Sequence, residues 1–382
     1  MENKTAFLVE PERFEIKETP MPVCGDDDVM IETKHMGICG SDVMFYQDPT
    51  VGGALDTKLP IVLGHEVSGV VVKTGKNVTK IRPGDRVALE PGVPCGKCSF
   101  CLSGKYNLCP DVDFMAAPPW KSAALHKYIS HPAAFTFKLP ENMDTIEGAM
   151  IEPLAVAVHA VKQMGDVKGM NIAVLGAGPI GNLVAQSAKG MGAAKVMITD
   201  VSDLRLDKAK ECGIDVCVNT KEKDFGEAMV EAFGPDKADV IYDCAGNNIT
   251  MGQAIKYARK GSVIVLVAVF AGMASIDLAV ANDHELDIKS TMMYRHDDYI
   301  DGIDLVNNGT VSELTLSTKA DVNVSGKNTA AAIPVTSTAS AGGSTISTSQ
   351  NLNLKAESKV ELTLNAGAEN TTAIVSDAAN IP

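Results

Sequence analysis

The sequence predicts an α/β protein in which a β-rich N-terminal domain precedes a doubly wound parallel sheet. Short runs rich in Val and Ile, such as 67–72, are interrupted by glycine and proline over the first 150 or so residues, which is typical of a compact barrel-like domain. From about residue 151, strand-like runs alternate with helical stretches, as in a parallel sheet with helical crossovers. The 382 residues are enough for two domains.

The second half of the sequence supplies the elements of this sheet in order. A buried strand is predicted at 171–175, followed by a glycine-rich turn and a helix at 179–191. The next strand is expected at 195–199 and the next helix at 204–212. Further strands are predicted at 239–243, 262–268 and 286–291.

The C-terminal tail has a different composition. From Ser312 to Pro382 it contains no aromatic residue, Cys, His or Met, and Ser, Thr, Asn and Ala dominate. Alternation of apolar and polar residues at 314–324 and 352–364 predicts extended strands, whereas 336–349 is of low complexity. The tail carries too little apolar bulk for a core of its own. We expect either a substituted, fused or artificial segment, or a divergent ending that still supplies edge strands.

Charge and hydropathy exclude several classes of function. The net charge of −14 argues against nucleic-acid binding, which needs a basic face, and gives no support for docking on anionic lipid. The first sixteen residues carry charges throughout, unlike a signal peptide, and the longest apolar stretch, 263–271, is too short to span a membrane. We therefore expect a cytoplasmic protein whose nine cysteines are thiols or metal ligands rather than disulfides.

Four of the nine cysteines are clustered within fifteen residues with the spacing C-x2-C-x2-C-x7-C. Structural zinc takes four ligands at tetrahedral corners, about 2.3 Å away when they are thiolates, and closely spaced cysteines on a looping backbone can reach those corners. The alternatives are four unrelated thiols in a polar lobe, or a disulfide pair. We predict a structural zinc ion, with no open ligand position, bound by Cys95, Cys98, Cys101 and Cys109.

A second set of candidate ligands is spread along the N-terminal domain. His65 and Glu66 lie between the strand-like runs 61–63 and 67–72, and Cys39 precedes Gly-Ser-Asp. Taken singly, His65 and Glu66 could be a hydrogen-bonded pair, and Cys39 a small buried residue. Together they make a plausible Cys/His/Glu set for a second zinc ion with an open position for substrate.

A glycine-rich loop, GAGPIG, follows the predicted strand at 171–175 and opens a predicted helix, which is the context that a dinucleotide-binding fingerprint requires. Its tight turn lets the backbone approach a pyrophosphate at the helix N-terminus. Asp200 ends the next strand, where a carboxylate binds the ribose 2′-hydroxyl and repels a 2′-phosphate, so NAD is favoured over NADP. The candidate cofactor-binding residues of the loop are Gly176, Gly178, Pro179, Ile180 and Gly181.

Seven motifs follow one another along the chain: GICGSD at 37–42, GHEVSGVVVKTG at 64–75, PGDRVALEPG at 83–92, CGKCSFCLSGKYNLC at 95–109, IEPLAVAVHA at 151–160, GAGPIG at 176–181 and DIKST at 287–291. Together they resemble the zinc-containing medium-chain alcohol dehydrogenase family, and within it the sorbitol (L-iditol) dehydrogenase branch. The resemblance covers about residues 1–311 and not the C-terminal tail.

The resemblance implies a domain organisation. A GroES-like catalytic domain would occupy 1–155, including a structural-zinc lobe at 90–112. A Rossmann NAD-binding domain would occupy 156–295, and a return segment with the atypical tail would occupy 296–382. Homo-oligomers are usual in the family, which implies that this chain also forms one.

The resemblance also implies roles for particular residues. Cys39, His65 and Glu66 match the ligands of the catalytic zinc, with water in the fourth position. Glu152 matches a glutamate that contacts this water or exchanges with it as a ligand. Ser41 matches the residue that passes the alcohol proton towards solvent.

One further residue of the predicted cofactor site comes only from the resemblance. Arg205 would flank the adenine ribose of NAD, its alternative being an ordinary exposed charge on a helix. With two zinc ions per chain and NAD, the expected activity is oxidation of a small-molecule polyol or secondary alcohol to a ketone. Zinc promotes loss of the hydroxyl proton, and the cofactor accepts the hydride.

Two departures from the branch bear on the substrate. The branch usually has His-Tyr shortly after CGSD, where this chain has Met44-Phe45. It usually has Arg-Tyr after the DIK strand, where this chain has Met293-Tyr294 with Arg295 one place late. Both changes remove polar contacts, so a less hydroxylated substrate becomes credible. The alternatives are a butanediol, threonine or simple alcohol dehydrogenase of the same family, or a catalytically impaired chimera that serves at most as a binding module.

Overall fold

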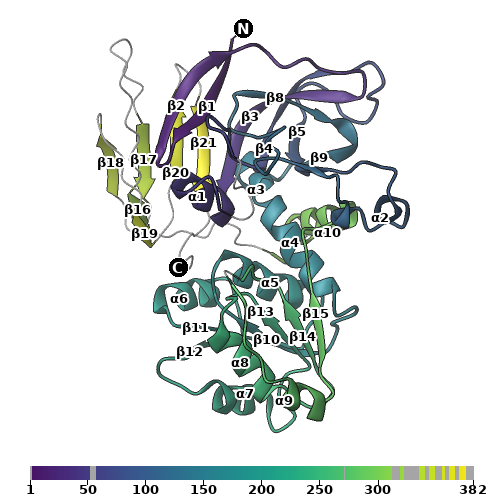
Figure 1. Ribbon diagram of the computed structural model, residues 1–382, viewed down its shortest axis with the longest axis vertical. Helices are drawn as coiled ribbons and strands as arrows, with labels where there is room; N and C mark the ends of the chain where they lie inside the picture. The colour runs from purple at the N-terminus through teal and green to yellow at the C-terminus, as the bar shows by residue number, and fades with distance from the viewer. Residues whose placement is uncertain are drawn as a thin grey trace. The chain divides into compact units, whose positions relative to one another are not determined.

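The computed structural model describes residues 2–51, 57–270 and 272–311, together with the backbone of six short strands between 319 and 375 (Figure 1). The chain forms two compact units. The first comprises Met1–Glu152 and Thr315–Ile381, and the second comprises Pro153–Leu314. The second unit therefore extends past residue 295, at which the sequence placed the end of the nucleotide-binding domain, because the last helix before the tail belongs to it.

The first unit is built mainly from antiparallel strands. Its strands before the tail are β1 (Asn3–Glu10), β2 (Arg13–Thr19), β3 (Asp28–Ile38), β4 (Glu66–Thr74), β5 (Arg86–Leu89), β6 (Gly92–Val93), β7 (Asp113–Phe114), β8 (Tyr128–Pro132) and β9 (Thr136–Lys138). Its short helical elements are α1 (Gly40–Gln47), α2 (Ser99–Leu102), η1 (Tyr106–Leu108), η2 (Ala133–Phe135) and α3 (Thr145–Ala149).

Strand β3 is the centre of the larger sheet of this unit. It pairs antiparallel with β4 along most of its length and with β8 over its first half. Alternate residues point to one face, so Val29 and Ile31 of β3 meet Val67 and Val71 of β4 in a common apolar core. This pairing brings the end of β3 beside the start of β4, where the candidate ligands lie.

The described strands of the tail join the same unit. Their bounds are β16 (Lys319–Asp321), β17 (Val335–Ala339), β18 (Ser344–Thr348), β19 (Lys355–Glu357), β20 (Glu361–Asn365) and β21 (Asn370–Val375). Strand β21 pairs parallel with the second half of β3, with Thr372 opposite His35 and Val375 opposite Ile38, and β20, β17 and β18 follow outwards.

The second unit contains a six-stranded parallel sheet. Its strands are β10 (Asn171–Leu175), β11 (Lys195–Asp200), β12 (Val216–Asn219), β13 (Val240–Asp243), β14 (Val263–Leu266) and β15 (Asp287–Ser290). Its helices are α5 (Pro179–Gly190), α6 (Asp203–Glu211), α7 (Phe225–Phe233), α8 (Asn248–Tyr257), α9 (Leu278–Asp283) and α10 (His296–Asn307). Helix α4 (Ile151–Lys162) begins at the last two residues of the first unit and continues into the second.

The strand order β12-β11-β10-β13-β14-β15 is that of a doubly wound sheet, which confirms the predicted fold class. Its central strands are almost continuously apolar because helices cover both faces. Helices α7, α8 and α9 share a core with one face, and α10 contacts α5 (Figure 1). In the described residues, no helix is long and apolar enough to span a membrane.

Candidate active site

The pairing of β3 with β4 brings three candidate ligands together. Strand β3 ends at Ile38, Cys39 caps the N-terminus of α1, and β4 starts at Glu66 directly after His65. The Cys39 sulfur, a His65 ring nitrogen and a Glu66 carboxylate oxygen all lie within 4.8 Å of one another. Residues 26 positions apart along the chain thus form one cluster of potential metal ligands.

The carboxylate of Asp42 holds the two loops of this cluster in place. One of its oxygens accepts a hydrogen bond from the Cys39 backbone N–H at 3.1 Å, and the other accepts one from the Gly64 N–H at 2.8 Å. Its Oδ2 atom also lies 3.6 Å from His65 Nδ1. The sequence did not single out Asp42, although an acidic residue three positions after a helix cap is a recognisable signal.

The electrostatics of the cluster favour a bound cation. Burial raises the pKa of Glu66 well above its usual range, and the nearby Cys39 and Glu152 raise it further. Burial lowers the pKa of His65, but Asp42 and Cys39 outweigh this effect, so the pKa is raised well above its usual value. A divalent cation would stabilise the ionised forms of Glu66 and Glu152, whose negative charges would otherwise repel each other.

The donor atoms fit zinc. One sulfur, one imidazole nitrogen and one carboxylate oxygen form a three-residue set that leaves a fourth tetrahedral position open. Among the described residues, the buried atoms His65 Nδ1 and Glu66 Oε2 have no hydrogen-bond partner. Glu66 Oε2 also occupies space that only a glycine at position 37 leaves, because a Cβ on Gly37 would lie 1.9 Å from it.

Three further residues lie beside this cluster. Glu152 is buried in the first turn of α4, close enough to Glu66 to raise the pKa of that residue. Ser41 lies in the first turn of α1, two residues after Cys39, and is partly buried. The ring of Phe114, which the sequence did not single out, is centred 5.4 Å from that of His65 and forms an apolar wall on one side.

The four clustered cysteines also converge. Their sulfur atoms all lie within 4.8 Å of one another, with 3.9 Å between Cys95 and Cys101 and 3.4 Å between Cys98 and Cys101. Four thiolates around one zinc ion would be about 3.8 Å apart if each Zn–S bond is about 2.3 Å. Cys98 caps α2, and Cys109 directly follows η1. The geometry fits a closed, four-sulfur zinc site.

The protonation of these thiols also fits a metal site. Backbone amides of Lys97 and Cys98 lower the pKa of Cys95 to about 7. Burial and the neighbouring Cys98 and Cys109 raise the pKa of Cys101 to about 12. Four thiolates at these distances need a cation to remain ionised together.

The glycine loop has the geometry of a phosphate-binding turn. Gly176 has a φ of +95°, and a Cβ on Gly181 would lie 1.8 Å from the Gly176 carbonyl oxygen. Gly178 caps α5, and the space where its Cβ would lie is open. Pro179 is the first helical residue, where its missing N–H costs nothing. The adjacent Ile180 is half-buried. Because the space at Gly178 is open, the N-terminus of α5 can bind an anion.

Asp200 connects this loop to the end of β11. Its carboxylate accepts hydrogen bonds from the backbone N–H groups of Ala177 at 2.8 Å, Val201 at 2.7 Å and Ser202 at 2.9 Å. Arg205 Nη1 lies 3.6 Å from Asp200 Oδ2. Both candidate ribose-binding residues therefore lie together beside the glycine loop.

The residues that replace polar groups of the sorbitol branch pack against apolar neighbours. Phe45 is buried, and its ring meets Trp120 edge-on at a centroid distance of 4.9 Å. Met44 packs partly buried in the same apolar cluster. The hydroxyl of Tyr46 donates a hydrogen bond to the Glu12 carbonyl at 2.6 Å, so Tyr46 does not replace the missing phenol.

Comparison with known proteins identifies the family. The family model "Alcohol dehydrogenase GroES-like domain" matches residues 25–141, and "Zinc-binding dehydrogenase" matches 179–308. An uncharacterized zinc-type alcohol dehydrogenase-like protein of Escherichia coli K12 is 42% identical over 77% of this chain and 84% of its own length. Sorbitol dehydrogenase of Macaca fascicularis is 41% identical over 74% of this chain and 80% of its own length.

Solved structures agree with this result. An oxidoreductase/dehydrogenase of unknown specificity from Escherichia coli matches with a TM-score of 0.78 and 39% identity, covering 82% of this chain and 89% of its own. A short chain alcohol dehydrogenase from Escherichia coli CFT073, complexed with NADH, matches with a TM-score of 0.73 and 30% identity, covering 81% and 89%. As its motifs predicted, this chain is an oxidoreductase of the zinc-containing medium-chain alcohol dehydrogenase family, in the sorbitol dehydrogenase branch.

Proposed function

We propose that this protein oxidises a secondary alcohol or polyol to a ketone and transfers the hydride to NAD. The observation that carries the proposal is the set of the half-buried Cys39 and the buried His65 and Glu66, whose ligand atoms converge within 4.8 Å. A zinc ion bound there would act as a Lewis acid and lower the pKa of the substrate hydroxyl. A second zinc ion at the four-cysteine cluster would have a structural role.

Each residue of the cluster has a separate task in this proposal. Cys39, His65 and Glu66 bind the catalytic zinc, and Glu152 lies near enough to replace a ligand or to orient a water molecule. Ser41, on the same helix turn as the Cys39 cap, accepts the proton that the substrate hydroxyl loses and passes it to solvent. Phe114 keeps one side of the site apolar, which strengthens electrostatic interactions within it.

The cofactor is NAD rather than NADP in this proposal. The buried carboxylate of Asp200 lies beside the glycine loop, where a 2′-phosphate would meet its negative charge. Arg205 lies close to that carboxylate and would contact the adenine ribose. A homologous structure complexed with NADH supports the nicotinamide cofactor. The predicted homo-oligomer remains a prediction.

The substrate carries fewer hydroxyl groups than sorbitol in this proposal. Phe45 lacks a hydroxyl and packs against Trp120, and Met293 occupies the position of the arginine of the branch. These residues offer apolar contacts where a polyol would need hydrogen-bond partners, so a diol or simple secondary alcohol should be preferred.

The test is NADH formation at 340 nm with a panel of sorbitol, xylitol, butanediol, threonine and simple alcohols, after zinc content has been measured. We expect two zinc ions per chain and the highest kcat/KM with butanediol or another secondary alcohol. The variant Cys39→Ser is the matched control, because it should lose turnover and one zinc ion. Absence of turnover on every substrate with two zinc ions bound would contradict the proposal and favour a chimera without catalytic activity.

A further inference from the structure

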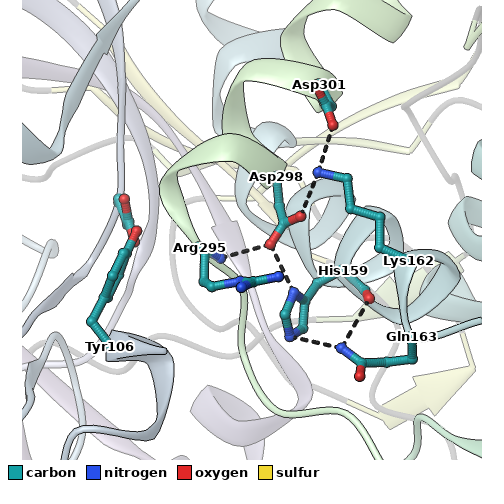
Figure 2. Close-up of polar contacts among 8 residues, drawn as sticks. Tyr106, His159, Lys162, Gln163, Arg295, Asp298 and Asp301 are labelled. Atoms are coloured by element: carbon teal, nitrogen blue, oxygen red, sulfur yellow. Dashed lines mark hydrogen bonds and ion pairs between the residues drawn. The ribbon is translucent and has the colours of Figure 1, made fainter. Parts of the chain in front are cut away.

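A buried ionic network joins α4 to α10 in the second unit, and its centre is Asp298 (Figure 2). The Asp298 carboxylate accepts hydrogen bonds from His159 Nδ1, from Lys162 Nζ and from the Arg295 backbone N–H, each at 2.8 Å. Lys162 also pairs with Asp301 at 2.5 Å. Asp298 is only 1% exposed, so its charge depends on these donors.

The charges of this network support one another. Burial raises the pKa of Asp298, but His159 and Lys162 outweigh this effect and hold it below its usual range. Burial lowers the pKa of Lys162, but Asp298 and Asp301 raise it by more. Apolar residues of the same shape often stabilise a fold as well as a buried ion pair does. Stability alone therefore gives a weak reason for an ionic network here.

The turn between β15 and α10 is strained. Met293 has a φ of +53°, a conformation that a side chain with a Cβ rarely adopts. The residues on both sides are fixed. The Thr291 N–H donates to the Leu266 carbonyl at 3.2 Å, and the Tyr294 ring is buried against that of Tyr299 at 5.2 Å.

Asp298 fixes the far end of this turn. Its carboxylate accepts a hydrogen bond from the backbone N–H of Arg295. Arg295 caps α10 and lies two positions after Met293. Strained backbone persists only where its surroundings over-determine it, and it is frequent at ligand sites. The Asp298 carboxylate is thus one of the restraints that hold Met293 in the left-handed region.

The position of the turn indicates which ligand it serves. It follows β15, and ligands of parallel sheets bind outside the carboxyl ends of the strands. The glycine loop after β10 takes the pyrophosphate, and Asp200 at the end of β11 lies on the adenosine side. The half formed by β13, β14 and β15 therefore faces the nicotinamide.

We propose that Asp298 is a positioning residue that holds the 291–295 turn, with its left-handed Met293, in the shape that binds the nicotinamide end of the cofactor. This inference rests on the proposed use of NAD. Different segments of the chain would bind the two halves of the cofactor. The turn would contact the nicotinamide half, whereas the glycine loop and Asp200 would bind the rest.

The test measures binding of NADH and of ADP-ribose, which lacks the nicotinamide, to the full-length zinc-loaded protein. Asp298→Ala, which removes both acceptor oxygens, should raise the Kd of NADH about tenfold, the size expected when one backbone restraint is lost, and change the Kd of ADP-ribose by less than about twofold. Asp301→Ala is the matched control, because Asp301 also contacts Lys162 but is half-exposed, and the Arg295 N–H donates to Asp298 instead. It should change neither Kd.

A double-mutant comparison tests the link to the strained turn. Met293→Ala and Met293→Gly both remove the side chain, but only glycine adopts a φ of +53° without cost. The Asp298→Ala effect on NADH should stay near tenfold in the Met293→Ala background and fall below about threefold in the Met293→Gly background. Equal effects in both backgrounds, or equal weakening of NADH and ADP-ribose, would overturn the proposal.

Two further outcomes keep the inference separate from the proposed function. If Asp298→Ala does not fold, the single variants of Met293 still test the strained turn on which the proposal depends: Met293→Gly should melt at a higher temperature than Met293→Ala, and the reverse order would overturn the proposal. If the unmodified protein binds ADP-ribose but not NADH, the proposed use of NAD fails first. Binding of NADH with no effect of Asp298→Ala refutes only the positioning role.

Discussion

Replacing Gly37 by alanine should remove one zinc ion from the protein and leave the other. Gly37 and Glu66 are directly opposite each other in the antiparallel pairing of β3 and β4, so their side chains share one face of the sheet. An added Cβ would lie 1.9 Å from Glu66 Oε2 and 2.9 Å from Glu66 Cβ. Since real Cβ contacts are essentially never under 3.0 Å, the carboxylate oxygen must move by at least the 1.1 Å difference.

A shift of this size is large compared with a zinc–oxygen bond of about 2.0–2.2 Å, so Glu66 would no longer reach the metal. Changes to groups that only orient a ligand already weaken metal binding by about 10–100-fold. Displacing a ligand should therefore cost about 100-fold or more in zinc affinity at this site, or about 2.7 kcal/mol. Turnover should fall in parallel, because Cys39 and His65 alone form an incomplete site.

The assay is elemental analysis of dialysed protein together with NADH formation. The matched control is Gly40→Ala at the start of α1, three residues after Gly37, where an added Cβ meets nothing within 4 Å, and this variant should keep two zinc ions. If Gly37→Ala also keeps two zinc ions and full turnover, Glu66 is not a ligand. Glu152 would then be the acidic residue to test next.

Three other predictions concern separate parts of the molecule. Cys109→Ser should reduce zinc from two ions to one per chain and lower the melting temperature, and retention of both ions would contradict the structural site. Asp200→Ala should lower the ratio of kcat/KM with NAD to that with NADP about tenfold or more, and an unchanged ratio would remove Asp200 from cofactor selection. Burial lowers the pKa of His131 to about 4, so the unfolded chain binds more protons between pH 6.5 and 4, and roughly 3 kcal/mol of stability should be lost as pH falls through this window. Urea unfolding at pH 7 and 4.5 should show a smaller pH effect in His131→Gln, and an equal effect would contradict this assignment.

The parallel sheet was largely predictable because its strands are buried on both faces. The predicted strands at 171–175, 195–199 and 239–243 correspond to β10, β11 and β13. Strand β12 was missed, since this edge strand has four half-buried residues and no long apolar run. Periodicity detects burial, so a short edge strand gives little signal.

The candidate site was predictable only through its motifs. Local spacing was enough to predict a four-cysteine site, whereas Cys39, His65 and Glu66 made only a plausible set of ligands until the family resemblance implied that role for them. Asp42 and Asp298 have a local helix-cap signal, but their other contacts could not be predicted because those partners are distant in sequence: Gly64 is 22 residues from Asp42, and His159 is 139 residues from Asp298. Only the fold brings such pairs together.

The pairing of β21 with β3 has a consequence for self-association of the protein in solution. Strand β8 covers the first half of one edge of β3, and β21 covers the second half, from His35 to Ile38, immediately before Cys39. A chain that lacks β21 would leave those backbone groups open to a strand from another molecule. Pairing of another strand at this edge would take place directly before Cys39, so loss of β21 would affect both self-association and the segment that leads into the ligand cluster.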